Sequence, residues 1–171
     1  MNDLFSINGA AFSECRNYRY ALWRIWDNDL PKVMFIGLNP STANENTDDP
    51  TIRRVVRFAK KWACGGVYMM NLFACVTPYP EQVKNWSDPI GDNDRWLIDI
   101  AKVCNGQVVC AWGDFKVAKE RAIEVKSMFF GRTWALVINK NGTPRHPLYV
   151  NGNITPILFN SDDNENTTNT K

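Results

Sequence analysis

The chain has few of the residues from which metal centres are built. It contains one histidine, His146, and five cysteines among 171 residues, and no two cysteines are spaced as C-x-x-C. Structural zinc and iron–sulfur sites need clusters of these ligands. The sequence therefore predicts neither a metal ion nor a metal cluster, and it favours free, buried thiols.

Standard phosphate-binding and hydrolase motifs are also absent. The sequence has no G-x-x-x-x-G-K-[ST] loop, no G-x-G-x-x-G turn and no G-x-S-x-G turn. These patterns mark P-loop nucleotide sites, dinucleotide sites and serine nucleophiles. Their absence removes the usual signatures of three enzyme classes, and no cofactor is expected.

Membrane and targeting signals are missing as well. No charged-then-apolar leader opens the chain and no apolar run reaches membrane-spanning length, so we expect a cytoplasmic protein without a membrane partner. Hydrophobic residues make up 44% of the chain and the net charge is +2, which is typical of a globular protein. The length favours a single α/β domain over residues 1–159, followed by a polar, disordered tail at 160–171.

What the sequence does contain is an alternation of strands and helices. Buried strands are predicted at 33–38, 67–72, 107–111 and 134–138, and helices at 50–63, from about 92 and from 114, the last burying Phe115. The arginine- and aromatic-rich segment 16–26 is compatible with an edge strand or a short helix that covers the core. This alternation predicts a three-layer α/β/α fold with a mainly parallel, four-stranded central sheet.

Polar residues stand where these strands end. Open α/β sheets bind ligands at the carboxyl ends of their strands, and here those ends carry Asn39, Asn71, Trp112-Gly113 and His146. Amide groups and a histidine suit the recognition of a neutral heterocycle and the stabilisation of charge on a leaving group. Each also has a structural alternative: an Asx turn at Asn39, backbone pairing at Asn71 and a surface position for His146.

Four stretches, taken in order, resemble motifs of the uracil-DNA glycosylase superfamily, and most closely those of its mismatch-specific branch. The whole chain also resembles a family of uncharacterised bacterial and phage proteins. The four stretches are Gly37-Leu38-Asn39-Pro40-Ser41, Tyr68-Met69-Met70-Asn71, Val109-Cys110-Ala111-Trp112-Gly113 and His146-Pro147-Leu148-Tyr149.

The resemblance implies a fold like that of these glycosylases and a role for each stretch. Asn39 would position the attacking water and His146 would polarise the departing base, so these two are the candidate catalytic residues. Asn71 would read the edge of the base, and Leu148 or Tyr149 would fill the gap left by a flipped nucleotide.

The remaining candidate substrate-binding residues stand next to Asn39 or shortly after Asn71 in the sequence. Ser41 stands where the main uracil branch has a bulky tyrosine, so the resemblance implies room beside C5 for thymine-like or larger modified pyrimidines. Phe73 is a candidate for stacking on the base, although a core position is equally compatible with its sequence context. The other candidates are Gly37, Leu38 and Pro40.

A basic helix face supplies the candidate DNA contacts. The predicted helix at 50–63 places five cations on the face opposite its apolar stripe, with no acid among them, which fits either a phosphate backbone or a solvated surface. With the residues beside the histidine, the candidate DNA-binding residues are Arg53, Arg54, Arg57, Lys60, Arg145, Leu148 and Tyr149.

The sequence thus leads to one main hypothesis and two alternatives. The main hypothesis is a monofunctional DNA glycosylase that hydrolyses the N-glycosidic bond of a pyrimidine, including a modified base of phage DNA, in repair or antiviral defence. The first alternative is the same chemistry on free nucleosides or nucleotides. The second is a catalytically inactive module that binds nucleic acid.

Overall fold

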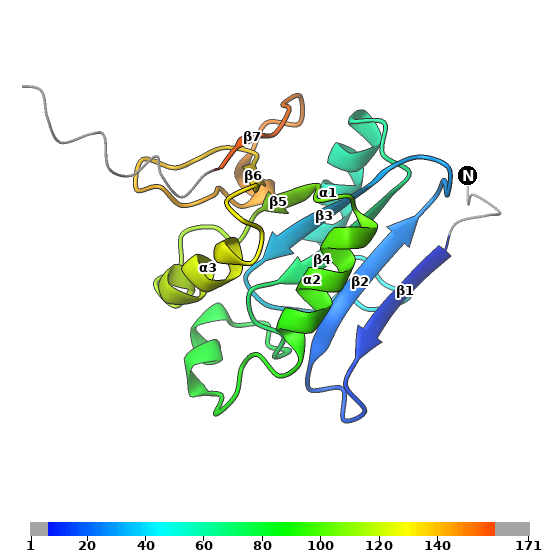
Figure 1. Cartoon of the computed structure of the whole chain (residues 1–171). Helices are drawn as coiled ribbons and strands as arrows, with labels where there is room; N and C mark the ends of the chain where they lie inside the picture. The colour runs from blue at the N-terminus through cyan, green and yellow to red at the C-terminus, as the bar shows by residue number, and fades with distance from the viewer. Residues whose placement is uncertain (1–6, 160–171) are drawn as a thin grey trace, which may run out of the picture.

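The computed structural model describes residues 7–159 (Figure 1). The disordered tail that the sequence predicts at 160–171 lies outside the described residues. Among the described residues no helix is both long and apolar enough to cross a membrane.

A seven-stranded mixed sheet forms the centre of the molecule. Its strands lie in the order β1-β2-β4-β3-β5-β6-β7. Strands β4, β3, β5 and β6 run parallel to one another, whereas β2 pairs antiparallel with β1 and β4, and β7 pairs antiparallel with β6. The strands are β1 (Ile7–Phe12), β2 (Arg19–Ile25), β3 (Lys32–Gly37), β4 (Gly66–Asn71), β5 (Val108–Cys110), β6 (Trp134–Ala135) and β7 (Ile157–Leu158).

The predicted fold, a mainly parallel four-stranded sheet like that of uracil-DNA glycosylases, is therefore wrong. The β1–β2 hairpin adds two antiparallel strands beside β4, and β7 adds a third antiparallel strand at the other edge. Their signals in the sequence are weak, because β2 mixes arginines with aromatic residues and both residues of β7 are exposed. Strand β6 is also shorter than the expected 134–138.

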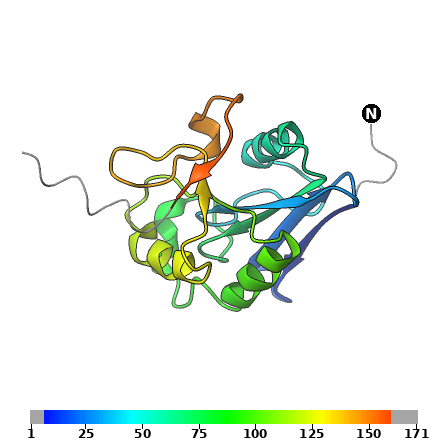
Figure 2. The ribbon, with the colours of Figure 1, turned by 45° about the horizontal axis from the view of Figure 1, so that its top comes forward.

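Three α-helices and two short 3₁₀ helices are present in the described chain. Helix α1 lies on one side of the sheet, and α2 and α3 lie on the other (Figure 2). Helix α3 begins at Ala118 rather than at the expected position 114. The helices are α1 (Pro50–Lys61), η1 (Pro80–Asn85), α2 (Asn93–Val103), α3 (Ala118–Ser127) and η2 (Pro147–Tyr149).

Alternating side chains of the central strands fill two cores. In β3, Val33 and Phe35 pack with α1, while Met34 and Ile36 pack with α2 and α3. This period of two is what a strand covered on both faces requires. Burying one such side chain contributes about 1.5–3 kcal/mol, so the two cores fix the sheet from both sides.

The start of α1 shows how local sequence sets the framework. The Asp49 side chain accepts a hydrogen bond from the backbone N–H of Ile52 at 2.9 Å, and Pro50 occupies the first helical position. Both features are standard helix-start chemistry. They bring Asp49 to the carboxyl edge of the sheet, beside the polar ends of β3 and β4.

Candidate functional site

A cavity of about 150 Å³ lies at the carboxyl ends of β3 and β4. Six of the predicted site residues line it, and they come from three separate stretches of the chain. They are Gly37, Leu38, Asn39, Ser41, Asn71 and His146.

Two further predicted residues, Pro40 and Phe73, do not line the cavity. Pro40 is buried and contributes its backbone carbonyl, which accepts a hydrogen bond from Asn39. Phe73 is buried in the core on the α2 and α3 side of the sheet, so the stacking role suggested for it has no geometric support here.

The Asn39 amide is fixed in one orientation. Its Nδ2 donates to the carbonyl of Thr77 at 2.7 Å and to that of Pro40 at 3.0 Å. The bond to Thr77 spans 38 residues, so the side chain does more than close a local turn. Because both amide hydrogens are used, Oδ1 is the atom left to interact with a ligand or a water molecule.

Asn71 ends β4 and is deeply buried, with 2% of its surface exposed. Its Nδ2 has no hydrogen-bond partner within residues 7–159. A Cβ atom on Gly37 would lie 2.9 Å from the Asn71 Oδ1, so a larger residue at position 37 would displace the Asn71 side chain. Buried polar groups are almost always paired, so this unpaired donor is a candidate binding feature of the cavity.

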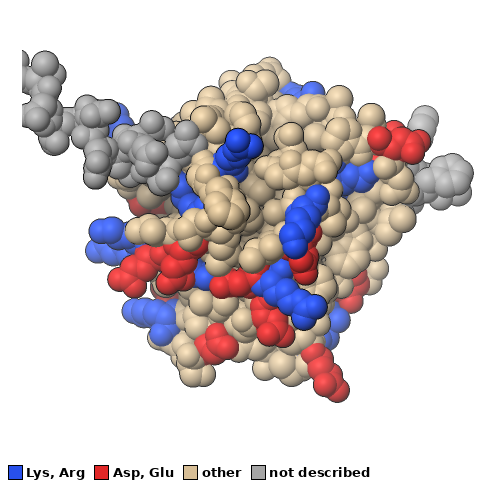
Figure 3. All heavy atoms as spheres, in the orientation of Figure 1, with Lys and Arg blue, Asp and Glu red and all other residues tan. Residues whose placement is uncertain are grey.

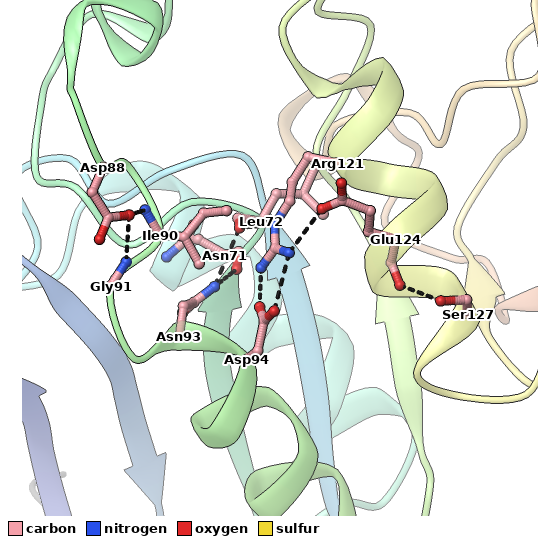
Figure 4. A network of polar contacts seen from close by, with 10 residues as sticks. All are labelled: Asn71, Leu72, Asp88, Ile90, Gly91, Asn93, Asp94, Arg121, Glu124 and Ser127. Atoms are coloured by element: carbon pink, nitrogen blue, oxygen red, sulfur yellow. Dashed lines mark hydrogen bonds and ion pairs between the residues drawn. The ribbon is translucent and has the colours of Figure 1, made fainter.

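A polar network binds the backbone carbonyls at the end of β4 (Figure 4). Asn93 donates to the carbonyl of Asn71 at 2.8 Å and to that of Leu72 at 3.2 Å, and Arg121 donates to Leu72 at 3.0 Å. Arg121 is in turn paired with Asp94 and Glu124. These contacts occupy the backbone of Asn71 and leave its side chain to the cavity.

His146 has a defined proton position. Its Nδ1 accepts a hydrogen bond from the backbone N–H of Leu148 at 3.3 Å, which caps η2. Burial lowers the pKa of His146, and the nearby Asp49 carboxylate opposes that shift. A neutral ring whose Nδ1 is an acceptor carries its proton on Nε2, so His146, which lines the cavity, has one N–H to donate.

Most of the basic face of α1 contacts the chain itself. Arg54 donates to the carbonyls of Pro147, at 3.3 Å, and Val150. Lys61 donates to the backbone carbonyl of Gly152 at 2.8 Å, and Arg53 donates to the backbone carbonyl of Asp48 at 2.7 Å. Lys60 lies over the Trp26 ring at 5.1 Å from its centre. Arg54 and Lys61 thus hold the segment after His146 against α1.

The other predicted DNA contacts lie around the histidine. Leu148 and Tyr149 are exposed, and the Tyr149 ring lies with its centre 5.9 Å from that of His146. Arg145 donates through Nε to the side-chain oxygen of Asn139 at 2.8 Å. The exposed pair therefore remains available to a partner, whereas Arg145 is engaged in its own loop.

Arg19, Asp49 and Phe115 are among the cavity-lining residues that sequence reasoning does not single out. Arg19 belongs to a segment that resembles an ordinary cover of the core, and Asp49 is recognisable only as a helix cap. The sequence predicts that a helix buries Phe115, but this residue is 39% exposed because α3 begins only at Ala118. The sequence feature that could have indicated Phe115 as a site residue is its position two residues after Trp112-Gly113.

Charge and metal-binding capacity within the described chain are limited. No group of three or more His, Cys, Asp or Glu residues in the range 7–159 could hold a metal ion. On the face seen in Figure 3, acidic and basic side chains are interspersed rather than gathered by sign. The cavity itself combines one carboxylate, Asp49, with donors from Arg19, Asn71 and His146.

The chain belongs to the DUF1643 family, described as a protein of unknown function, whose model matches residues 19–148. That range contains every residue that lines the cavity. No curated protein and no solved structure matches the chain significantly. None of these comparisons connects it with the uracil-DNA glycosylase superfamily, so that resemblance stays a prediction.

Proposed function

We propose that this protein is a DNA glycosylase that hydrolyses the N-glycosidic bond of a pyrimidine nucleotide held in the cavity at the ends of β3 and β4. One observation carries the proposal: a cavity of about 150 Å³ is lined by a neutral His146 and by Asn71, whose buried Nδ2 has no hydrogen-bond partner within residues 7–159. A cavity of about 150 Å³ accommodates a single six-membered ring. The proposal rests on this cavity and not on the predicted fold, which the seven-stranded sheet overturns.

In this reaction, water adds to the anomeric carbon while the bond from that carbon to the base breaks. Both electrons of the broken bond go to the base, and the proton released by water passes to the base or to solvent. Oδ1 of Asn39 orients the water, which suffices when the sugar develops strong cationic character. His146 Nε2 donates to the carbonyl oxygen of the departing base, a contribution of about 10²–10³ in rate for one preorganised donor.

The rest of the nucleotide fits a second hollow that adjoins the cavity. This groove of about 360 Å³ shares Trp112 and Phe115 with the cavity and is lined by the exposed Lys116 and Lys119. Lysines beside an exposed aromatic ring suit a phosphodiester strand whose bases stack as they pass. Leu148 and Tyr149, both exposed, fill the space of the extruded base in this proposal.

The small Ser41 side chain on the cavity wall supports a base that is substituted at C5. We therefore include modified pyrimidines of phage DNA among the substrates, in a repair or antiviral role. A cytoplasmic setting fits the five cysteines, which are all free.

A second candidate function is the same hydrolysis on free nucleotides. The observation that favours it is the basic face of α1, whose Arg54 and Lys61 donate hydrogen bonds to carbonyls of the chain. A nucleotide needs only the cavity and the adjoining groove.

The test is a mass-spectrometric search for released bases. The purified protein is incubated with ordinary, uracil-substituted and phage-modified DNA, and with the matching free nucleotides. We expect a free pyrimidine and an abasic site from DNA, and we expect Asn39→Ala and His146→Ala each to lower release by at least about 100-fold. Release from nucleotides alone supports the second candidate.

Asn46→Ala provides the control. Asn46 is exposed in the loop between β3 and α1, and it does not line the cavity. This variant should release the base at the rate of the unmodified protein. Binding of DNA without release from any substrate would instead indicate a catalytically inactive module.

A further inference from the structure

Most of the exposed aromatic side chains belong to segments that form or adjoin the cavity. Phe115 lines the cavity, the Tyr149 ring lies beside that of His146, and Tyr79 stands between two cavity-lining prolines. The fourth, Phe130, lines a hollow at the amino ends of β5 and β6. Within residues 7–159 the exposed aromatic side chains are Tyr79, Phe115, Phe130 and Tyr149.

The backbone around Tyr79 is firmly held although the Tyr79 side chain is 55% exposed. Its backbone N–H donates to Oγ1 of the buried Thr77 at 3.2 Å, and the Thr77 carbonyl accepts a hydrogen bond from Asn39 at 2.7 Å. Pro78 and Pro80 restrict the backbone on both sides of Tyr79. A side chain that is presented by a rigid segment loses little conformational entropy when it binds a ligand.

The segments that carry Tyr79 and Phe115 reach the cavity from opposite sides of β3. Strands β4 and β5 are the two neighbours of β3 in the sheet (Figure 1). Tyr79 belongs to the segment that follows β4, and Phe115 belongs to the segment that follows β5. The exposed Lys116 comes directly after Phe115 and lines the adjoining groove. Aromatic rings combined with cations suit a nucleic-acid strand whose bases stack on the rings.

We propose that Tyr79 and Phe115 stack on the bases that flank the nucleotide in the cavity, and that the strand they bind is single-stranded DNA. The reason is that the bases of a duplex already stack on one another, whereas a single strand offers its base faces to side chains. The inference rests on the proposed function for the nucleotide in the cavity, but it concerns binding and does not require hydrolysis.

The experiment compares three DNA probes of equal length by fluorescence anisotropy with the full-length protein. The probes are a single-stranded oligothymidine, the same deoxyribose-phosphate chain without bases, and the duplex of oligothymidine with oligoadenosine. We expect the oligothymidine to bind at least about tenfold more tightly than the chain without bases, since one stacked base contributes about that factor. The oligothymidine should also bind more tightly than the duplex, whereas binding through phosphates alone favours the duplex with its higher charge density.

Variants of Tyr79 separate stacking from charge. Tyr79→Ala should weaken binding of the oligothymidine by about tenfold and leave binding of the chain without bases unchanged. Tyr79→Phe keeps the ring and should bind both probes as the unmodified protein does. The matched control is Phe130→Ala, which removes an exposed aromatic ring at the other end of the strands and should change neither affinity. Circular dichroism checks that each variant is folded.

The outcomes separate this inference from the proposed function. Equal affinity for the oligothymidine and the chain without bases, tighter binding of the duplex, or unchanged oligothymidine binding by folded Tyr79→Ala would each overturn it, even if the protein releases bases from DNA. A preference for the single strand that depends on Tyr79, combined with no base release from any substrate, would uphold the stacking role and refute the glycosylase.

Discussion

Helices α1 and α3 use their cations in opposite ways. The lysines and arginines of α1 form an acid-free face, yet Arg54 and Lys61 bind backbone carbonyls between Pro147 and Gly152. Helix α3 mixes lysines with glutamates, yet the exposed Lys119 lines a groove beside the cavity.

The comparison shows that a run of like charges does not by itself identify a nucleic-acid surface. Arginine has several donors in a planar fork and readily holds backbone carbonyls together. Here that property positions the segment that follows His146. The groove beside α3 has fewer cations, but it shares Trp112 and Phe115 with the cavity, which makes it the stronger candidate for a phosphate contact.

The largest effect should come from Arg54→Met. Removing the donors to Pro147 and Val150 leaves carbonyls unpaired and frees the loop that positions His146. We expect the free energy of unfolding to fall by about 1–3 kcal/mol and base release to fall by about 100-fold. Urea denaturation and the release assay measure the two effects.

Lys61→Met is the control for this variant, since Lys61 holds the same segment at Gly152, farther along the chain from His146. It should reduce stability with a smaller decrease in activity. Base release by Arg54→Met at the rate of the unmodified protein would show that α1 does not position the histidine.

An intermediate effect is expected for the double variant Lys116→Gln and Lys119→Gln. These exposed lysines line the groove, so replacing them should weaken DNA binding by about tenfold. For every phosphate that the protein no longer neutralises, the slope of log affinity against log salt should also fall by about 0.7–0.9. Fluorescence anisotropy at several salt concentrations measures both quantities, and an unchanged slope would argue against the groove.

The smallest effect should come from Arg53→Gln combined with Arg57→Gln. Both residues are exposed on α1, and Arg53 donates to the carbonyl of Asp48. Removing these charges should weaken DNA binding by less than about threefold at about 0.15 M salt, because charges outside the contact are screened. If this pair has a larger effect than the lysine pair, the helix face predicted from the sequence is the binding surface.

Several features of the site can be predicted from the sequence because they depend on neighbours along the chain. The apolar run that ends in Gly37-Leu38-Asn39 is typical of a buried strand followed by a turn, and β3 ends at Gly37. The Asp-Pro pair at 49 and 50 indicates the start of α1. Parallel strands end at the same edge, so Asn39, Asn71 and His146 are expected to converge, and they line one cavity.

Other features depend on partners that are distant in sequence. The antiparallel pairing of β2 with β4 joins segments more than 40 residues apart, and the arginines of β2 obscure its alternation. The exposure of Phe115 depends on where α3 begins. Neither can be predicted from local pattern, because hydrophobic periodicity reports burial and not the identity of the covering element.

The sequence by itself determined which residues form the buried strands that lead into the site and which polar groups stand at their ends, since both follow from local periodicity and turn chemistry. Only the tertiary structure decided what those groups do. It provided Arg24 and Arg121 with carboxylate partners, left Arg19 without one among the described residues and bound the cations of α1 to the loop after His146. The physical reason is that a charge acts through the groups within a few ångströms of it, and the fold alone determines which groups those are.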